Sequence, residues 1–339
     1  MSKKPKYQPP YTITPTILNL VAQISESVGR LTALTDSVKS LRLRRINRVR
    51  SIRGSLAIEG NTLSEKQITA ILDGKRVTAP PREIQEVRNA IAAYEHLEQW
   101  RPEAEIDLLE AHHRMMADLI DDAGVYRRGG VGVMAGGRVI HMALSADRVP
   151  VLMRDLIQWL ATSGEHPLIT SSVFHYEFEF IHPFADGNGR MGRLWQTLIL
   201  TLWNPLFTDI PVESMVHEHQ TEYYQALQKS SDQANSVLFI EFMLGMIIDA
   251  VSTAAPQVAP PVTPQVERLL EVMQGEMTRE AIQHVLGLQD RKSFRERYLN
   301  PALAAELIEM TIPDKPNSRL QKYCQTDKGR HWVQQREEV

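Results

Sequence analysis

Residues 182–193 read HPFADGNGRMGR, and their types and spacing suit the binding of a phosphorylated ligand. The segment contains a turn of three small or turn-forming residues, Gly187, Asn188 and Gly189. The apolar residues of the following RMGRLWQTLILTLW have helical spacing, so the turn opens a helix. A glycine-containing loop at a helix N-terminus directs unpaired N–H groups at an anion, which predicts an anion-binding loop.

Side chains around this turn supply further chemistry. Arg190 and Arg193 share one helix face and can each hold phosphate oxygens bidentately. Cations there oppose the helix dipole, and a bound polyphosphate would compensate. Asp186 is a hard oxygen ligand of the kind that holds Mg²⁺ on a nucleotide. His182 can act as a general base near neutral pH, and Phe184 can anchor the loop in the core.

A plainer interpretation is a helix-opening loop with surface arginines and a hydrogen-bonded core histidine. A lone Gly-Asn-Gly sequence would favour that interpretation. Here a base, a metal ligand, an anion cradle and two arginines lie within a dozen residues, and the combination favours a polyphosphate site.

The same stretch resembles the signature of the Fic family, His-Pro-Phe-x-acid-Gly-Asn-Gly-Arg-x-x-Arg, at every specified position. The segments HYEFEF and EYYQAL also resemble helices that flank the signature in that family. The resemblance implies transfer of AMP from Mg²⁺-ATP to a Ser, Thr or Tyr hydroxyl of a target protein. It implies His182 as base, Asp186 as Mg²⁺ ligand, and Arg190 with Arg193 on the β- and γ-phosphates. Tyr223 or Tyr224 would line the adenine pocket, and we take Tyr224 as the candidate.

A second segment, SLAIEGN at 55–61, ends a predicted helix with a carboxylate in an unfavourable place. Ser55 and Glu59 lie four residues apart on one helix face, and Gly60 stops the helix. A glutamate in the last turn meets the negative end of the helix dipole, at a cost of about 0.3–1 kcal/mol. Taken alone, Glu59 would be a solvated side chain.

The segment also resembles the autoinhibitory motif that some Fic proteins carry, Ser/Thr-x-x-x-Glu-Gly/Asn. The resemblance implies that Glu59 pairs with Arg193 and occupies the group needed by the γ-phosphate. Ser55 would orient the helix or bond near the nucleotide. Because the motif lies in the same chain, no separate antitoxin is implied.

The bulk composition is that of an ordinary globular protein. Its 339 residues are 43% hydrophobic and 23% charged, with a formal net charge of −3. The single cysteine fits a reducing compartment, and the N-terminus lacks the apolar core of a secretory signal. The apolar run 237–251 contains Glu241 and Asp249 and is predicted to be a buried helix, with no membrane partner. These features predict a cytoplasmic protein.

Apolar spacing predicts a mainly α fold. An apolar stripe begins after Thr14 as N-cap and Pro15 as first helical residue, and a second helix over 40–59 should bury Ile46, Val49, Ile52 and Leu56. Ser64 with Gln67 predicts a capping box for a helix that ends near Gly74. Further helices are predicted over 82–99, 103–120, 147–162, 168–181, 188–203, 213–230 and 235–252.

The segment 129–142, GGVGVMAGGRVIHM, departs from this pattern and predicts a β-hairpin with Gly136–Gly137 at its turn. Its edge can pair with an extended segment, holding a target hydroxyl against the site. The alternative is a structural hairpin that covers a core edge. The Fic family has a target-positioning flap here, but this chain reads HMALSADRVP where paired prolines would be expected, so the accepted peptide is not predicted.

The fold class is therefore expected to be a Fic-type helical domain with a small hairpin flap and a C-terminal winged-helix-like domain. The predicted divisions are an N-terminal helical region with the inhibitory helix at 1–100, a catalytic core at 101–252, a Pro/Ala linker at 253–264 and the winged-helix-like domain at 265–339.

The C-terminal region could bind DNA through Arg291, Lys292, Arg295 and Arg297. Yet residues 265–339 contain 12 Lys plus Arg and 12 Asp plus Glu, which disfavours phosphate-driven binding. Docking or a homo-oligomer is the favoured role. Residues 1–60 hold 11 Lys plus Arg against 3 Asp plus Glu, and these arginines are predicted to form a solvated helix face.

Three other functions stay open on the sequence alone. Glu59 could activate water, so that the same site removes AMP from a modified target. The site could transfer another nucleotide, because no residue fixes the base. A DNA-binding regulator that senses ATP is the third.

Overall fold

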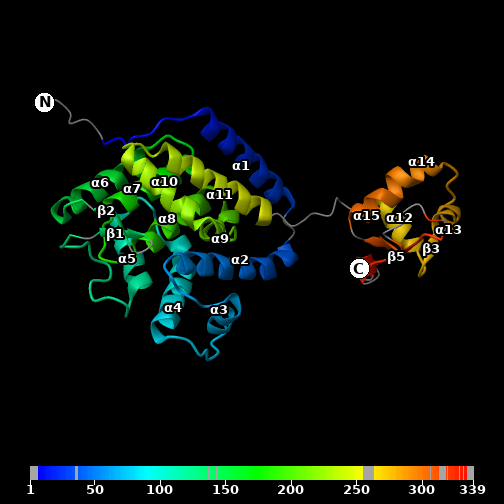
Figure 1. Ribbon diagram of the computed structural model, residues 1–339, viewed down its shortest axis with the longest axis horizontal. Coiled ribbons are helices and arrows are strands. Elements are labelled where there is room, and N and C mark those ends of the chain that lie inside the picture. The colour runs from blue at the N-terminus through cyan, green and yellow to red at the C-terminus, as the bar shows by residue number, and fades with distance from the viewer. Residues whose placement is uncertain are drawn as a thin grey trace. The chain divides into compact units, whose positions relative to one another are not determined.

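The computed structural model describes residues 7–34, 37–130, 132–135, 138–142, 144–254, 263–305, 307–312, 318, 320–327, 329–330 and 332–333. The chain divides into two compact units, Met1–Ala255 and Pro256–Val339. The first is built of helices with one β-hairpin, and the second combines short helices with a small sheet (Figure 1). The predicted mainly helical fold class is confirmed.

The helices of the first unit fall in two groups along the chain. Those before the candidate loop are α1 (Pro15–Leu34), α2 (Ser37–Ile58), α3 (Glu65–Leu72), α4 (Pro81–His96), α5 (Glu105–Met116), α6 (Val149–Thr162) and α7 (Pro167–Ile181). Those after it are α8 (Asn188–Trp203), α9 (Val212–Glu218), α10 (Gln220–Asp232) and α11 (Val237–Ala254).

Local sequence signals account for several helix starts. The Thr14 hydroxyl accepts a hydrogen bond from the Ile17 N–H at 3.1 Å, which caps α1 as predicted. Ser64 and Gln67 form the predicted reciprocal capping box at the start of α3. Gly60 has φ +93°, so a residue without a Cβ ends α2.

Two details differ from the sequence predictions. Ile46, predicted to face inward from α2, is 36% exposed, whereas Val49, Ile52 and Leu56 are buried. The segment predicted as one helix over 213–230 is two helices, because the backbone at His219 leaves the helical region with φ −113° and ψ 36°. No glycine or proline marks that break in the sequence.

The centre of the first unit is the pair α7 and α8, which are in contact along their length (Figure 1). Both helices are buried on nearly every side. Helices α6 and α11 contact α7, while α5 and α2 contact α8. Helix α11 contains the apolar run 237–251 and packs against α1 and α10, as expected for a buried helix. In the described part of the chain, no helix is long and apolar enough to span a bilayer.

Helix α2 is held closely against α9, and this contact fixes the position of its last turn. A Cβ on Gly54 would lie 2.6 Å from the backbone of Glu213, so only glycine permits this approach. The Ser214 hydroxyl donates to the Arg50 carbonyl at 3.0 Å, and the Gln220 amide donates to the Ile58 carbonyl at 2.8 Å. The end of α2 is therefore placed by tertiary contacts.

The predicted hairpin is present as β1 (Gly132–Ala135) and β2 (Arg138–Met142), which pair antiparallel with an irregularity between Val133 and Met134. Its predicted turn at Gly136–Gly137 lies outside the described residues. The buried guanidinium of Arg127 donates to the carbonyls of Gly129 and Leu144, on either side of the hairpin. Arg127 thereby fastens both ends of the hairpin to the body of the unit.

The second unit has its own apolar core. Its helices are α12 (Pro264–Val272), α13 (Arg279–Val285), α14 (Arg291–Phe294) and α15 (Asn300–Ala304), the last two joined by a π-helical turn. Its strands are β3 (Met277–Thr278), β4 (Ile308–Met310) and β5 (Lys322–Gln325). They form an antiparallel sheet in the order β3-β5-β4, and the strand β3 was not predicted. Most of the predicted turn PDKPNS, residues 313–317, lies outside the described residues.

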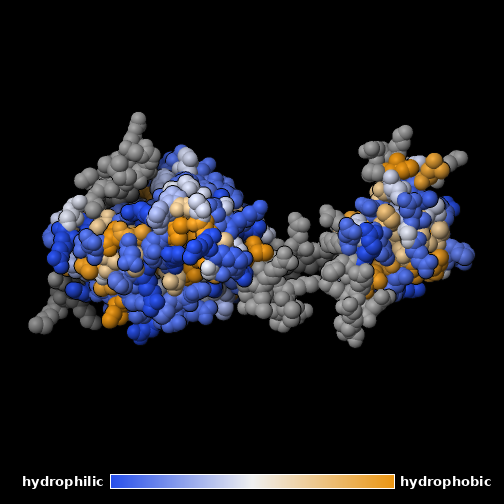
Figure 2. All heavy atoms as spheres, turned by 90° about the horizontal axis from the view of Figure 1, so that it is seen from below, coloured by the Kyte–Doolittle hydropathy of each residue, from blue (hydrophilic) through white to orange (hydrophobic). Residues whose placement is uncertain are grey.

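The surface shows how the basic N-terminal region is accommodated. Arg50 and Arg53 each lie 4.0 Å from the Glu65 carboxylate, and Arg45 pairs with Asp73. These exposed pairs fit the prediction of a solvated basic helix face with acidic partners on another helix. On the face drawn in Figure 2, hydrophobic residues gather in small patches among hydrophilic ones.

Candidate active site

The loop between α7 and α8 brings the HPFADGNGRMGR residues together. It begins at His182, whose φ of +53° is left-handed and costs conformational energy for a non-glycine residue. Arg127 Nε donates to the His182 carbonyl at 2.6 Å, and this contact helps hold the unusual backbone conformation. Gly187 has φ +84° at the N-cap of α8, and a Cβ there would lie 2.6 Å from Met116 Sδ. The loop therefore depends on glycine at this position.

His112 on α5 is a supporting group for the loop. Its Nδ1 accepts from the Gly124 N–H at 2.8 Å, and its Nε2 donates to the Asp186 carbonyl at 3.0 Å. Its ring stacks on Phe184 with a centroid distance of 3.6 Å. Burial lowers the pKa of His112 to about 4, so the imidazole is neutral at pH 7. The expectation that Phe184 anchors the loop in the core is met, and His112 is a buried histidine with both ring nitrogens hydrogen-bonded.

The side chain of Asn188 closes the loop on itself. Its amide oxygen accepts from the Phe184 N–H at 2.9 Å, and its amide nitrogen donates to the Phe184 carbonyl at 2.9 Å. Both functional groups of this side chain are thus used within the protein. What Asn188 offers an external ligand is its backbone N–H in the first turn of α8.

The N-terminus of α8 combines unpaired N–H groups with two buried cations. No side chain caps the helix. Arg190 and Arg193 are 3% and 2% exposed, so each is a charge that needs a compensating partner. In the described part of the chain, Nε and Nη1 of Arg190 have no hydrogen-bond acceptor. Buried guanidinium donors without an acceptor, next to an uncapped helix start, form a site for an anion.

Asp186 lies at the mouth of the loop, with its side chain 44% exposed. Its Oδ1 accepts from the Gly187 N–H at 2.6 Å and from Arg190 at 3.2 Å, and its Oδ2 lies 3.5 Å from Arg82. Among the described residues, no three His, Cys, Asp or Glu side chains gather as a metal site. A Mg²⁺ ion that takes most of its ligands from phosphates and water needs one or two carboxylates, and an exposed carboxylate beside an anion cradle fits it.

The end of α2 reaches this site from the other side. Arg193 Nη2 donates to Glu59 Oε1 at 2.6 Å and to the Ser55 carbonyl at 3.0 Å. Arg193 Nε donates to the Ser55 hydroxyl at 3.2 Å. The contact of Glu59 with Arg193 is the one that the sequence resemblance led us to expect, whereas the bonds from Arg193 to Ser55 were not part of that expectation.

Glu59 also lies against the start of α8. A Cβ built on Gly189 would overlap Glu59 Oε1, so the carboxylate occupies the space in front of the helix N-terminus. Burial by itself lowers the pKa of Arg193, but the charge and hydrogen bond of Glu59, together with the charges of Tyr223 and Glu179, outweigh this effect and raise the pKa above its ordinary value. Glu59 therefore serves Arg193 as the anion that the buried guanidinium requires.

The two tyrosines of α10 have different surroundings. Tyr223 is fully buried, and its hydroxyl lies 3.1 Å from His175 Nε2. Tyr224 is half-buried, and burial raises the pKa of its hydroxyl, with the Glu59 carboxylate adding to the effect. Of the two, Tyr224 is the side chain that faces the end of α2 and has exposed surface for a ligand.

Sequence reasoning missed Glu179, which lies one helical turn before His182 on α7. Glu179 Oε2 is 3.8 Å from His182 Nδ1, and the residue is 8% exposed. Burial raises the pKa of Glu179 to about 7, while Arg193 lowers it and Glu59 raises it further. The i, i+3 spacing in HYEFEFIH was the signal for this contact, but only the fold reveals that the carboxylate is buried.

The neighbouring His175 does not form an ion pair with Glu179. Although the two side chains are 3.9 Å apart, burial lowers the pKa of His175 to about 3, so the imidazole is neutral. His175 Nδ1 bonds with the Gln196 amide oxygen at 2.7 Å. In the described residues, Glu179 Oε1 has no hydrogen-bond donor. Glu179 is thus a buried carboxylate whose charged neighbours are Arg193 and Glu59, with His182 beside it.

The first unit is a helical domain whose central helix, α8, begins at a glycine-containing loop beside two buried arginines. A model of the Fic/DOC family matches residues 102–200, and a model of the Filamentation induced by cAMP protein Fic-like, C-terminal domain matches residues 264–326. A solved Fic family protein from Desulfovibrio desulfuricans G20 is 54% identical, with a TM-score of 0.73, over 95% of this chain and 99% of that one. This protein belongs to the Fic family.

Similarity extends to relatives whose names state an activity. A protein adenylyltransferase fic-1 from Caenorhabditis elegans is 34% identical over 187 residues, which are 51% of this chain and 34% of the relative. A protein adenylyltransferase Fic from Aedes aegypti is 29% identical over 199 residues, which are 54% of this chain and 37% of the relative. The chain thus spans about a third of the length of these curated relatives.

Proposed function

We propose that this protein is an enzyme, a protein adenylyltransferase that moves AMP from Mg²⁺-ATP to a Ser, Thr or Tyr hydroxyl of a target protein. The observation that carries the proposal is the pair of buried arginines at the uncapped start of α8, where Arg190 has donors without an acceptor. A polyphosphate with several oxygens satisfies these donors together with the first N–H groups of the helix. The names of the relatives from Caenorhabditis elegans and Aedes aegypti support the choice of adenylyl transfer.

In the proposed reaction, His182 removes the proton from the target hydroxyl as the hydroxyl oxygen bonds to the α-phosphorus. The bond from the α-phosphorus to the oxygen that bridges it to the β-phosphorus breaks, and pyrophosphate is the leaving group, held by Arg190 and Arg193. The backbone of Gly187, Asn188 and Gly189 holds the phosphates, so catalysis depends mainly on positioning and charge. Asp186 would hold the Mg²⁺, which neutralises charge on the phosphates when it is bound.

The imidazole of His182 must present one nitrogen to the hydroxyl. Its Nδ1 lies toward Glu179, so Nε2, on the opposite side of the ring, is the nitrogen that we assign to proton removal. An ionised Glu179 favours a proton on Nδ1 and thereby leaves Nε2 able to accept another. Glu179 acts here as a positioning residue for the base.

We further propose that Glu59 inhibits the enzyme. The proposal is supported by the hydrogen bond from Arg193 to Glu59 and by the position of the carboxylate against Gly189, where we propose that the γ-phosphate binds. ATP that binds beside it would have its α-phosphate turned away from in-line attack. Release of Glu59 from Arg193 is then required for efficient transfer.

Target binding is proposed for the hairpin β1–β2, whose edge can pair with an extended target segment. Arg127 bonds both to the base of the hairpin and to the His182 carbonyl, and this shared contact supports a common placement of target and base. The roles of the second unit in docking, oligomer formation or DNA binding stay predictions, as do its winged-helix-like character and a cytoplasmic location.

ATP labelled at different phosphates tests the reaction. Incubation of the Glu59→Gly protein with Mg²⁺-ATP and a cell lysate should transfer label from the α-phosphate to protein and none from the γ-phosphate. Transfer of γ-label would indicate a phosphoryl transferase and contradict the proposal. Loss of AMP from a pre-modified target incubated with the protein that retains Glu59 would identify hydrolytic removal of AMP, and a panel of labelled nucleotides identifies the base.

The role of Glu179 predicts a change in the pH dependence of transfer. Its raised pKa means that the carboxylate forms as pH rises through the neutral range, and the His182 base must be unprotonated as well. In the Glu59→Gly background, the limiting slope of log rate against pH on the acid side should fall from about two to about one in Glu179→Gln. Glu59 raises the pKa of Glu179, and the Glu59→Gly background lacks this effect. The fall in rate on the acid side should therefore lie at lower pH in that background than in the protein that keeps Glu59.

The rate at its optimum should also fall by roughly tenfold in Glu179→Gln. Steady-state rates across pH 5 to 9 provide the measurement. The control is Glu98→Gln, which changes an exposed glutamate outside the candidate site. An unchanged slope together with an unchanged optimum rate would show that Glu179 is structural only.

A further inference from the structure

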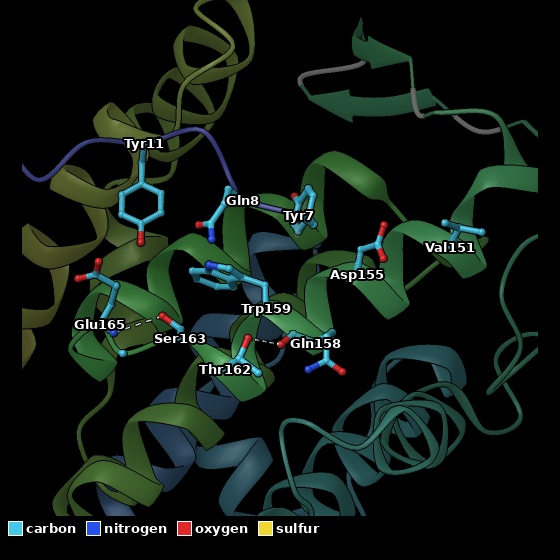
Figure 3. Close-up of a pocket in the computed structure, with 11 residues that line it drawn as sticks. Tyr7, Gln8, Tyr11, Val151, Asp155, Gln158, Trp159, Thr162, Ser163 and Glu165 are labelled. Atoms are coloured by element: carbon cyan, nitrogen blue, oxygen red, sulfur yellow. Dashed lines mark hydrogen bonds between the residues drawn. The ribbon is translucent and has the colours of Figure 1, made fainter. Parts of the chain in front are cut away.

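A groove separate from the candidate active site lies between the N-terminal segment, residues 7–11, and helix α6 (Figure 3). Its volume is about 690 Å³, which is within the range of sites for small organic ligands. Three aromatic side chains and two carboxylates dominate the lining, namely Tyr7, Tyr11, Trp159, Asp155 and Glu165. The described part of the lining contains no lysine or arginine. This composition favours ligands with positive charge over ligands with negative charge.

The aromatic rings form a corner within the groove. The rings of Tyr11 and Trp159 have centroids 6.5 Å apart and planes at 80° to each other. In Figure 3 the indole of Trp159 lies between Tyr11 and Tyr7, along the floor of the groove. The two rings meet edge to face and Trp159 is buried, so the half-buried rings of Tyr7 and Tyr11 are the aromatic surface offered to a ligand. The face of such a ring carries negative electrostatic potential, which attracts a cation.

The carboxylates lie beside these rings. Burial raises the pKa of Tyr11 to about 12, and the charge of Glu165 adds to the effect, so Glu165 lies near that phenol. At the other end of the groove, the Tyr7 hydroxyl donates to Glu177 Oε2 at 2.6 Å, with Asp155 also near the ring. Glu177 is 5% exposed, and burial raises its pKa.

Two carboxylates line the groove, and Glu177 lies beside it as the partner of Tyr7. Within the described residues, neither Asp155, Glu165 nor Glu177 forms an ion pair, whereas the carboxylates near α8 and α3 pair with arginines. A buried carboxylate whose partner is a tyrosine hydroxyl gains more from a nearby cation than an exposed one does. The groove therefore combines aromatic rings with two carboxylates, Asp155 and Glu165, that pair with no cation among the described residues.

We propose that this groove binds an organic cation, an ammonium or guanidinium group carried on a flexible alkyl chain. Asp155 lies seven residues before Thr162 on α6, roughly 10 Å along the helix, and Glu165 follows the end of that helix, so a ligand with two cations fits the two carboxylates. Polyamines have this form, as do two basic side chains of an extended peptide. Anionic ligands such as nucleotides are disfavoured, which makes this site chemically distinct from the loop at α8 and independent of the proposed transfer reaction.

Calorimetric titration of the full chain at low ionic strength tests the proposal with three probes. These are spermidine, a capped hexapeptide with two arginines, and the same peptide with citrulline in place of arginine. Spermidine or the arginine peptide should bind, and the citrulline peptide, which has the same shape without charge, should not. Tighter binding of spermidine would identify a free polyamine as the source of the cation, and tighter binding of the peptide would identify a basic protein segment.

Asp155→Asn combined with Glu165→Gln should weaken binding by about tenfold or more, while Glu98→Gln, an exposed glutamate outside the groove, should leave it unchanged. Trp159→Phe should keep measurable binding but lose the change in tryptophan fluorescence that accompanies it. Equal binding of the citrulline peptide, an unchanged affinity in the double variant, or no binding of either cation at millimolar concentration would overturn the proposal.

Discussion

Replacement of Glu59 by glycine should raise the rate of AMP transfer by roughly 10- to 100-fold. This corresponds to about 1.4–2.7 kcal/mol, the free energy by which Glu59 competes with the γ-phosphate for Arg193. The expectation rests on the contact from Arg193 Nη2 to Glu59 Oε1 at 2.6 Å, which a γ-phosphate must replace. The side chain of Glu59 is 34% exposed, so solvent screens the ion pair and a larger gain is not expected.

The same substitution should change stability in a nucleotide-dependent way. Without Glu59, the buried guanidinium of Arg193 loses its carboxylate, and we expect a less stable protein in the absence of ATP. ATP supplies the missing charge, so the rise in melting temperature on addition of Mg²⁺-ATP should be larger for Glu59→Gly than for the unmodified protein. Differential scanning calorimetry with and without nucleotide measures this difference.

Two further variants separate inhibition from folding. Ser55→Ala removes one acceptor from Arg193 but leaves Glu59 in place, so its effect on the transfer rate should be smaller. Glu98→Gln alters an exposed carboxylate elsewhere and should have no effect. An unchanged transfer rate in Glu59→Gly, measured on a protein with a normal melting curve, would contradict the inhibitory role of Glu59.

Replacement of His182 by alanine should lower the transfer rate by about 10²–10⁴-fold, the usual contribution of a general base. The variant loses proton removal from the target hydroxyl but keeps the loop contacts made by Phe184, Asn188 and Arg190. Binding of ATP should therefore change little. Loss of turnover with retained nucleotide affinity is the signature that distinguishes a catalytic role from a structural one.

The measurement uses the Glu59→Gly background, in which transfer is expected to be fast enough to follow over several orders of magnitude. His284→Ala provides the matched control, because His284 is an exposed histidine in the second unit. Isothermal titration with a non-hydrolysable ATP analogue checks that the site is intact. Transfer at near-normal rate by Glu59→Gly with His182→Ala would remove His182 from the mechanism.

The positioning of His182 depends on residues that carry no motif. Arg127 reaches the His182 carbonyl from a segment 55 residues earlier, and it is buried against three further carbonyls. Its sequence neighbourhood, VYRRGG, has no feature that separates Arg127 from the exposed Arg128. Which of two adjacent arginines is buried depends on how the chain packs, so a single sequence does not reveal it.

Prediction from the sequence was also limited wherever packing overrides local preference. The apolar spacing of α2 includes Ile46, yet that residue is partly exposed, whereas Val49, Ile52 and Leu56 further along the helix are buried. The break at His219 has no local signal in the sequence. It allows the first residue of α10, Gln220, to donate a hydrogen bond to the Ile58 carbonyl at the end of α2. In both cases the deciding contacts come from distant parts of the chain.

The sequence by itself determined the elements whose causes are local: the caps of α1 and α3, the glycine that ends α2, the turn at Gly187, and the helix that follows it. These depend on backbone conformation and hydrogen bonds within a few residues. Only the tertiary structure decided that Glu179 is buried beside His182, and that Asp155 and Glu165 line one groove with Trp159. Burial and charge pairing depend on which surfaces meet in three dimensions, and one sequence does not contain that information in any local pattern.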